Sequence, residues 1–276
     1  MAARKPGERP LTLLQLAVIA VVQGITEFLP ISSSGHLRLI PVLGDWPDQG
    51  LAIDVAVHVG TLLAVIAYLW RDVLAMLGGL IRLGSGMAHP GVRLMLYLLV
   101  ATIPVVAAGY AVTEFLGTAW RNSLEVIAWA TLGFGLLLHL SDRIGLTVRR
   151  LEHMGLWSAF AIGLAQALAL IPGASRAGVT MTAARLLGFE RRDAARFSML
   201  MSIPTILAAG AFAAGELVES GDPVLQSNAL LAGGIAFVAA LIAIAAMMGW
   251  LRRATFAPFV IYRVILGAAL LGIVYL

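Results

Sequence analysis

One stretch near the start of a very apolar chain, Gln23–His36, holds the side chains best suited to chemistry. It contains the carboxylate of Glu27, three consecutive serines and the imidazole of His36. On a helix, Glu27 shares one face with Gln23 and Thr26. Packing between helices would explain Gln23 and Thr26, but an isolated buried carboxylate is costly unless it is protonated, paired or bound to a cation. We therefore interpret Glu27 as a functional residue.

The serines follow Pro30, which ends the helix because proline disfavours helical geometry in the residue before it. Their hydroxyl and N–H groups can form a cradle for phosphate, especially if His36 opens a helix whose N-terminus points at the anion. A serine helix cap without a ligand is the alternative. Because His36 and Glu27 lie beside the serines, we favour a site with the nucleophile, base and acid of a phosphoryl transfer. The cradle residues would be Ser32, Ser33, Ser34 and Gly35.

A second stretch, Gln166–Gly178, resembles the first and adds an arginine. Its ends are twelve residues apart (178 − 166), the same spacing as from Gln23 to Gly35 (35 − 23). The planar guanidinium of Arg176 matches the geometry of phosphate. At membrane depth it needs an anion, either Glu27 in a purely structural ion pair or a bound phosphate. The predicted phosphate ligands here are Gly173, Ser175, Arg176 and Gly178, with Gln23 and Gln166 as further polar contacts.

Two other groups of polar residues allow more than one interpretation. Asp54 and His58 are four residues apart and would support the site, bind an ion or lie in the membrane interface. The segment Phe256–Arg263 begins the last apolar run, and its aromatic residues are typical of an interface belt.

The composition predicts an all-α polytopic membrane protein. The chain is 60% hydrophobic and 12% charged, whereas soluble domains carry about 25% charged residues. Its long Leu/Ala/Val runs differ from the alternation of barrel strands. It has no cysteine, which excludes disulfides and thiolate sites. We expect no cleavable signal peptide and no nucleic-acid partner, because the basic residues fit topology determinants in short loops.

The apolar runs predict two similar halves within one membrane domain, residues 1–276. Each half would contain one re-entrant helix–loop–helix and three spans, and an odd number of spans makes the second half inverted with respect to the first. The halves would cover residues 11–140 and 155–276. The re-entrant segments would be Leu11–Leu29 with His36–Leu43, and Leu156–Ile171 with Val179–Leu187; the spans would be Leu51–Trp70, Arg93–Tyr110, Leu124–Leu140, Ala194–Leu217, Ala229–Leu251 and Pro258–Leu276, with Val73–Leu83 at the interface.

The distribution of arginines predicts the orientation. With the N-terminus on one side, most arginines fall on the other side, which the positive-inside rule makes cytoplasmic. Both termini would then face outward, although Arg4, Lys5 and Arg9 argue against this. Among the residues assigned to the cytoplasmic side are Arg82, Arg143, Arg185, Arg191, Arg252 and Arg263, and among those on the outer side are Arg38 and Arg121.

The motifs Gln23–His36 and Pro172–Gly178 resemble the two signature motifs of the undecaprenyl-diphosphatase family, bacterial inner-membrane enzymes associated with bacitracin resistance. The resemblance covers the whole chain. It implies hydrolysis of undecaprenyl diphosphate to undecaprenyl phosphate and inorganic phosphate, which recycles the lipid carrier of peptidoglycan synthesis. It also implies two inverted repeats, a site that opens to the periplasm and a divalent cation. The matching functional residues are Glu27, Ser33, His36, Ser175 and Arg176.

Two residues depart from the family pattern. Gln23 stands where some members have a second glutamate, which weakens any scheme with two carboxylates on a metal. Ala177 replaces a serine of the second motif and removes one hydroxyl from the cradle. We expect Glu27 to hold Mg²⁺ or Ca²⁺, which prefer oxygen ligands.

The sequence does not decide which group is the nucleophile. The candidates are Ser33, His36 and a water activated by His36 or Glu27. The partners would be a polyprenyl diphosphate and membrane lipid, and a homodimer stays open. The competing function is a lipid-carrier transporter or flippase, because inverted repeats with broken helices are also a transporter architecture. His36 beside Ser33 and Glu27 favours hydrolysis, since binding alone would not require that set.

Overall fold

The computed structural model describes residues 11–44, 46–81, 89–115, 123–219 and 222–276, and this part of the chain is almost entirely helical. Within it, the only β pairing is an isolated bridge between Arg149 and Phe189. The helices are α1 (Leu13–Thr26), α2 (Ser33–Gly44), α3 (Gly50–Tyr68), α4 (Trp70–Ile81), α5 (Pro90–Phe115), α6 (Leu124–Ile144), α7 (Leu156–Gln166), α8 (Arg176–Leu186), α9 (Arg191–Glu219), α10 (Pro223–Trp250) and α11 (Ala257–Tyr275), with 3₁₀ turns at Leu151–His153 and Ala167–Leu170.

Five of these helices are long and apolar enough to cross a membrane, and they are α3, α5, α6, α10 and α11. They coincide with five of the six predicted spans, so a multi-pass helical membrane protein is confirmed. The sixth predicted span, Ala194–Leu217, lies within α9. The first turns of α9 are rich in charge, with Arg191, Arg192, Asp193 and Arg196.

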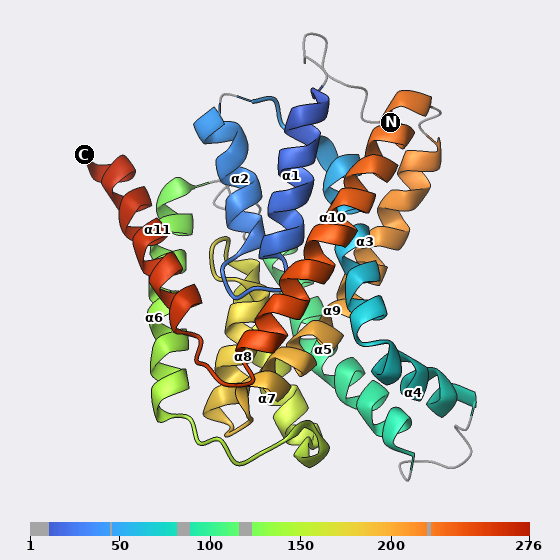
Figure 1. The fold of residues 1–276 in the computed structure, drawn as a ribbon, viewed down its shortest axis with the longest axis vertical. Helices are drawn as coiled ribbons and strands as arrows, with labels where there is room; N and C mark the ends of the chain where they lie inside the picture. The colour runs from blue at the N-terminus through green and yellow to red at the C-terminus, as the bar shows by residue number, and fades with distance from the viewer. Residues whose placement is uncertain (1–10, 45, 82–88, 116–122, 220–221) are drawn as a thin grey trace.

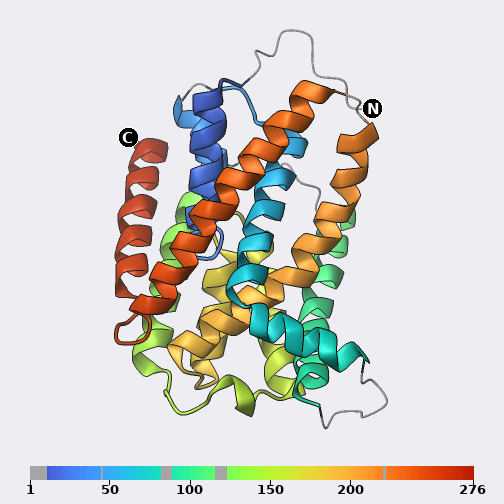
Figure 2. The ribbon, with the colours of Figure 1, turned by 45° about the vertical axis from the view of Figure 1, so that its right-hand side comes forward.

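Two pairs of helices, α1 with α2 and α7 with α8, consist of helices that are too short to cross a membrane. At about 1.5 Å per residue, the 14 residues of α1 and the 11 residues of α7 are shorter than the roughly 17–25 residues of a membrane-spanning helix. Figure 1 shows α1 and α2 in the upper half of the molecule and α7 and α8 in the lower half, so that the loops of the two pairs meet near the centre. The longer helices surround this meeting point, and α10 crosses the molecule obliquely (Figure 2).

The boundaries of the short helices differ from the prediction. Helix α2 begins at Ser33 rather than His36, and α8 begins at Arg176 rather than Val179. In both cases a serine directly before the helix adopts a left-handed backbone conformation that starts the helix early. Helix α7 ends at Gln166 and continues as a 3₁₀ turn, not as regular helix to Ile171.

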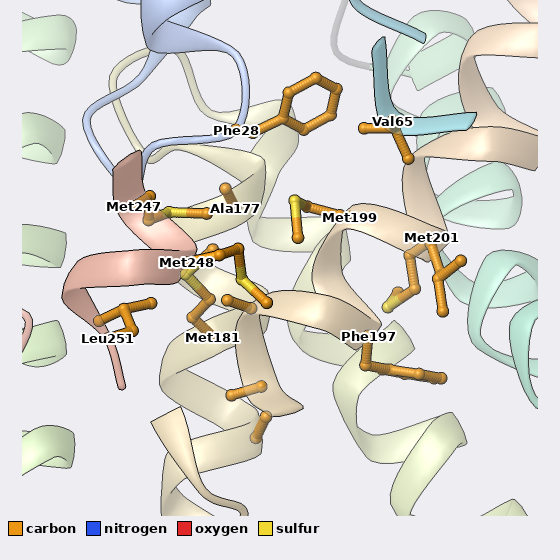
Figure 3. Packing of buried hydrophobic residues seen from close by; sticks show 14 of the residues in the cluster. Phe28, Val65, Ala177, Met181, Phe197, Met199, Met201, Met247, Met248 and Leu251 are labelled. Carbon is orange, nitrogen blue, oxygen red and sulfur yellow. The ribbon is translucent and has the colours of Figure 1, made fainter. Parts of the chain in front are cut away.

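Close helix contacts hold the frame together. Helices α3 and α10 approach so closely that a Cβ added to Gly60 would lie 2.1 Å from the carbonyl oxygen of Gly233. Beneath the central loops, a core rich in methionine packs against Phe28, the residue that follows Glu27 (Figure 3). Because Phe28 is only 1% exposed, the core fixes the place of its neighbour Glu27.

Helix α4 agrees with the predicted interfacial segment in length and sequence. It exposes Trp70, Leu74 and Leu77, and its buried Asp72 pairs with Arg196 of α9. Its position at a membrane surface stays a prediction. Of the residues used for the orientation, Arg4, Lys5, Arg9, Arg82 and Arg121 lie outside the described part of the chain.

Candidate functional site

The first loop is a tight turn between α1 and α2. Helix α1 ends at Thr26 with Glu27 as its C-cap. Ser32 has a φ of 75°, a conformation that non-glycine residues rarely adopt. Its hydroxyl accepts a hydrogen bond from the N–H of Gly35 (3.4 Å) and so caps α2. Strained residues of this kind persist only where their surroundings fix them, and they cluster at functional sites.

The second loop repeats this turn between the 3₁₀ segment and α8. Ser175 has a φ of 72°, and its hydroxyl accepts a hydrogen bond from the N–H of Gly178 (3.1 Å). Gly173 has a φ of 90°, and a Cβ there would lie 2.5 Å from the carbonyl oxygen of Ile127. Only glycine fits at this position, so the turn is built into the sequence.

An ion pair joins the two loops. The Oε1 atom of Glu27 accepts a hydrogen bond from Nη2 of Arg176 at 3.0 Å, across 149 residues of sequence. Its Oε2 atom accepts hydrogen bonds from the hydroxyl of Ser33 (2.6 Å) and from Nε2 of Gln23 (2.9 Å). The Glu27 and Arg176 side chains are 7% and 16% exposed. The predicted proximity of Glu27 and Arg176 is therefore confirmed.

The guanidinium of Arg176 is held in place from its other side. Its Nη1 atom donates to the carbonyl oxygen of Ser198 on α9 (2.9 Å), and its Cζ lies 5.5 Å from the centre of the Phe28 ring. A substrate phosphate that displaced Glu27 would thus meet a cation that is already oriented.

His36 is bonded away from Ser33. Its Nδ1 lies 2.7 Å from the carbonyl oxygen of Ser32, and its Nε2 lies 2.5 Å from the hydroxyl of Tyr262. A carbonyl only accepts, so Nδ1 carries the hydrogen and Nε2 of the neutral ring accepts from Tyr262. Among the described residues, the partner of the Ser33 hydroxyl is Glu27.

A second imidazole faces Glu27. The Nε2 atom of His58, on α3, lies 3.7 Å from Oε2 of Glu27. Its Nδ1 lies 2.6 Å from the carbonyl oxygen of Asp54, and the Asp54 carboxylate accepts from Gln49 (2.8 Å). Of the three alternatives for this pair, support of the site fits His58.

Two residues that the prediction placed outside the site contact it, and this corrects the prediction; Tyr262 was assigned to an interface belt and Arg263 to the cytoplasmic side. Tyr262 stacks on His36 with ring centroids 5.6 Å apart. Arg263, which we expected on the cytoplasmic side, is fully buried and contacts both loops. The signal was present in the sequence, because an arginine inside an apolar span deserves the same functional interpretation as Glu27.

The remaining predicted residues surround this centre. Ser34 is exposed, with its hydroxyl 3.5 Å from that of Ser32. Gln166 is 1% exposed, and neither polar atom of its side chain has a hydrogen-bond partner; Oε1 of Gln23 is likewise buried and unpaired. Buried amides without partners are uncommon and call for an explanation. Contacts of these residues with a substrate stay predictions.

The part of the chain that the structure describes contains no cluster of three or more histidine or carboxylate side chains that could hold a metal ion. Two oxygen donors at the site come from neighbouring side chains, the Glu27 carboxylate and the unpaired Oε1 of Gln23, whose Nε2 donates to Glu27. Mg²⁺ often binds to one or two carboxylates together with substrate phosphates. The donors therefore fit a hard cation that is completed by a phosphate ligand.

An apolar groove of about 1090 Å³ runs along α10 and is lined by residues 21–29, α10 and the start of α11. Val21 and Ile25 of α1, on the face opposite to Gln23, form one wall together with Leu29 of the loop that follows α1. Phe259, one helical turn before Tyr262, lies at the α11 end. The other lining residues include Leu230, Gly234, Val238, Ile242, Ala246 and Trp250 of α10.

Comparison with known proteins gives consistent matches over nearly the whole chain. The sequence profile of the bacitracin resistance protein BacA family matches residues 16–269. Undecaprenyl-diphosphatase 1 of Rhodospirillum rubrum is 54% identical over 270 residues, which cover 96% of this chain and 96% of that protein. The undecaprenyl-diphosphatases of Roseobacter denitrificans and Ruegeria pomeroyi are each 50% identical, over 96% of this chain and 100% of their own length.

We predict that Glu27→Gln lowers the unfolding temperature in detergent, because it leaves Arg176 buried without an anion. Breaking a buried ion pair from one side costs about 3–5 kcal/mol. The double variant Glu27→Gln/Arg176→Gln should unfold nearer to the wild type than Glu27→Gln does. The control is Glu190→Gln, which breaks the solvent-exposed Arg150–Glu190 pair and should change the unfolding temperature little. Equal decreases in the unfolding temperature of Glu27→Gln and Glu190→Gln would contradict the structural importance of the buried pair.

Proposed function

The chain belongs to the bacitracin resistance protein BacA family, and from this premise we propose that it hydrolyses undecaprenyl diphosphate to undecaprenyl phosphate and inorganic phosphate. The observation that carries the proposal is the Glu27–Ser33–Arg176 constellation between two buried turns. It combines a hydroxyl bonded to a carboxylate with an oriented guanidinium that suits a phosphate. A transporter would not need the carboxylate-bonded hydroxyl, and the relatives named above give that alternative no support.

In the proposed first step, the Ser33 oxygen attacks the terminal phosphorus of the diphosphate. The Ser33 proton passes to Glu27 along the existing 2.6 Å hydrogen bond. The bond between the terminal phosphorus and the bridging oxygen breaks, and its electron pair leaves with undecaprenyl phosphate. Arg176 moves its hydrogen bond from Glu27 to the transferred phosphoryl group, whose developing charge it stabilises.

In the second step, water attacks the phosphorus of the phosphoserine. The water gives a proton to Nε2 of His36, which is the acceptor nitrogen of the neutral ring once Tyr262 yields it. The phosphorus–oxygen bond to Ser33 breaks, and Glu27 returns the proton to the Ser33 oxygen. Phosphate leaves, His36 releases the proton taken from the water to the solvent, and the Glu27–Arg176 pair re-forms.

Glu27 and Gln23 are the residues that would hold a divalent cation, Mg²⁺ or Ca²⁺. When bound, the cation supplies positive charge that neutralises the diphosphate. Because Gln23 contributes no charge, the protein alone offers a single carboxylate, and we expect the ion to bind much more tightly together with the substrate.

The apolar groove is the proposed site for the prenyl tail. It is lined almost entirely by aliphatic and aromatic side chains, it faces outward between α1, α10 and α11, and it ends within one helical turn of Tyr262. A lipid whose head occupies the central turns would find its tail beside this groove.

An inverted repeat is supported by parallel features of the two halves. Ser32 and Ser175 share the left-handed conformation and the hydrogen bond to a glycine N–H. Helix α1 packs on α10, and α7, its counterpart in the second half, packs on α5. The boundaries 11–140 and 155–276, and a homodimer, stay predictions.

We further propose that the protein lies in the bacterial inner membrane with its site open to the periplasm. The C-terminal ends of α6, α8 and α10 gather in the lower part of Figure 1, and the helix ends and turns that adjoin them carry arginines such as Arg143, Arg191 and Arg252. The positive-inside rule places that side in the cytoplasm. The α1–α2 pair with exposed Ser34 lies on the opposite side.

Purified wild-type protein should release phosphate from undecaprenyl diphosphate, and Ser33→Ala, Glu27→Ala and Arg176→Ala should each lower kcat/KM by about 10²–10³-fold or more, the usual effect of removing a group that stabilises the transition state. Phosphate release in a reconstituted membrane checks this. Label from a substrate carrying ³²P in its terminal phosphate should be trapped on Ser33 in acid-quenched enzyme. Wild-type turnover with no label on Ser33 would exclude the phosphoserine step.

Removal of divalent cations with a chelator should abolish phosphate release, and Mg²⁺ or Ca²⁺ should restore it. Without the cation, the diphosphate charge is opposed only by protein cations. Gln23→Glu, which adds a second carboxylate, should lower the metal concentration needed for half-maximal activity. Full turnover by chelator-treated protein with no detectable metal would refute the cation requirement.

Filling the groove should impair long substrates selectively. Ala246→Trp places a large side chain in the groove, so kcat/KM for undecaprenyl diphosphate should fall about 10-fold or more, since each buried CH₂ contributes about 0.8 kcal/mol. A short-chain prenyl diphosphate should be hydrolysed as before. Ala245→Trp, on the neighbouring exposed position outside the groove, is the matched control. An equal loss on both substrates would argue against tail binding there.

A further inference from the structure

Arg263 of α11 lies at the centre of the molecule beneath both loops. Its side chain is fully buried, and each hydrogen bond that it makes goes to a backbone carbonyl. From the first loop it binds the carbonyl oxygen of Pro30 (3.1 Å), and from the second those of Gly173 (3.0 Å) and Ala174 (3.1 Å from each Nη atom). On α6 it binds the carbonyl oxygens of Ala130 (3.3 Å) and Thr131 (3.0 Å).

No carboxylate in the described part of the chain pairs with Arg263. The other fully buried arginine, Arg185, shows how the same fold handles a buried cation: it pairs with Asp142 at 3.2 Å. A buried charge without a counter-ion is costly, so Arg263 is not explained by the stability of the fold alone. Its charge stays uncompensated beside a site that receives an anion.

The carbonyls that Arg263 holds stand at matching places in the two turns. Pro30 precedes the left-handed Ser32 by two residues, and Gly173 precedes the left-handed Ser175 by two. One planar guanidinium therefore fixes the two turns relative to each other. Ser33 and Arg176, which directly follow the two serines, carry the reacting hydroxyl and the phosphate clamp.

The surroundings are shaped around this guanidinium. A Cβ on Gly178 would lie 2.9 Å from Nη1 of Arg263, and a Cβ on Gly135 of α6 would lie 2.9 Å from Cβ of Arg263. Larger residues at either position would displace the side chain. Lysine could not replace it, because an ammonium offers three donors at one point, whereas the guanidinium offers five in a rigid fork.

We infer that Arg263 is a positioning residue that locks the two phosphate-binding turns together, so that Ser33 from one turn and Arg176 from the other act on the same phosphoryl group. The inference rests on the proposed phosphatase function. The variant Arg263→Lys distinguishes the positioning role of Arg263 from its positive charge, because lysine keeps the charge but cannot bind the carbonyls of both turns.

The test is a double-mutant cycle on phosphate release from undecaprenyl diphosphate, with Arg263→Lys, Arg176→Lys and the double variant. Arg263→Lys should lower kcat about 100-fold, the effect of misplacing reacting groups by about 1 Å, with a much smaller change in KM. Arg176→Lys should then lower kcat by a far smaller factor in the Arg263→Lys protein than in the wild type, because the guanidinium of Arg176 is already misaligned there. General destabilisation would instead multiply the two effects, and that outcome would overturn the inference.

Two further variants keep the result interpretable. Arg253→Lys, an exposed arginine after α10, should leave kcat unchanged. If Arg263→Lys does not fold, Gly135→Ala is the second variant: its Cβ would lie 2.9 Å from Cβ and 3.2 Å from Nε of Arg263 and would displace that side chain. It should give the same loss of kcat and the same non-additivity with Arg176→Lys. Full activity of Gly135→Ala would speak against the bridge. Absence of phosphate release by the wild type would refute the proposed function itself, a distinct result.

Discussion

The structure depends on satisfying the backbone of two short helical pairs that break deep inside a helical membrane protein. Polar backbone groups cannot be left to hydrocarbon, so a broken helix at that depth must find partners inside the protein. The serine caps supply acceptors for the N–H groups at the starts of α2 and α8. Arg263 supplies donors for the carbonyls that precede them. The same groups that make the breaks tolerable also hold the reacting side chains, so stability and catalytic geometry share one set of contacts.

Charge at the site follows from the same constraint. A guanidinium that enters the interior from α8 needs an anion, and Glu27 serves in the absence of substrate. A diphosphate can take that place, because Arg176 is also held by Ser198 and Phe28 and does not need Glu27 to keep its orientation. Glu27 is then available for the hydroxyl of Ser33. The buried pair is therefore better understood as a resting arrangement of the catalytic groups than as a source of stability, since buried pairs contribute little net stability.

The sequence was sufficient to predict the helical membrane class, five spans and the meeting of Glu27 with Arg176. These follow from composition, from run length and from the high cost of isolated charges in lipid. The sequence was not sufficient to predict the first residues of α2 and α8, because the left-handed conformations of Ser32 and Ser175 depend on contacts made across the molecule. It also failed for Tyr262 and Arg263. For Tyr262, the start of a span looks the same as an interface belt, and a helix that is apolar on nearly every side carries no periodicity to show which face turns inward. For Arg263 the signal was present, because an arginine in an apolar span is a candidate functional residue, but it was interpreted as a topology determinant.

The register of the two motifs shows how the halves divide the work. A shift of 143 residues (166 − 23) aligns Gln23 with Gln166, Ser32 with Ser175 (175 − 32) and Gly35 with Gly178 (178 − 35). The aligned residues form the turns and their caps. Under the same shift, Ser33 aligns with Arg176 (176 − 33) and Glu27 with Leu170 (170 − 27), so the chemical groups differ where the scaffold agrees. One turn supplies the carboxylate and the hydroxyl, and the other supplies the cation. The proposed phosphoryl transfer needs both sets, and it therefore also needs the bridge that we infer between the turns.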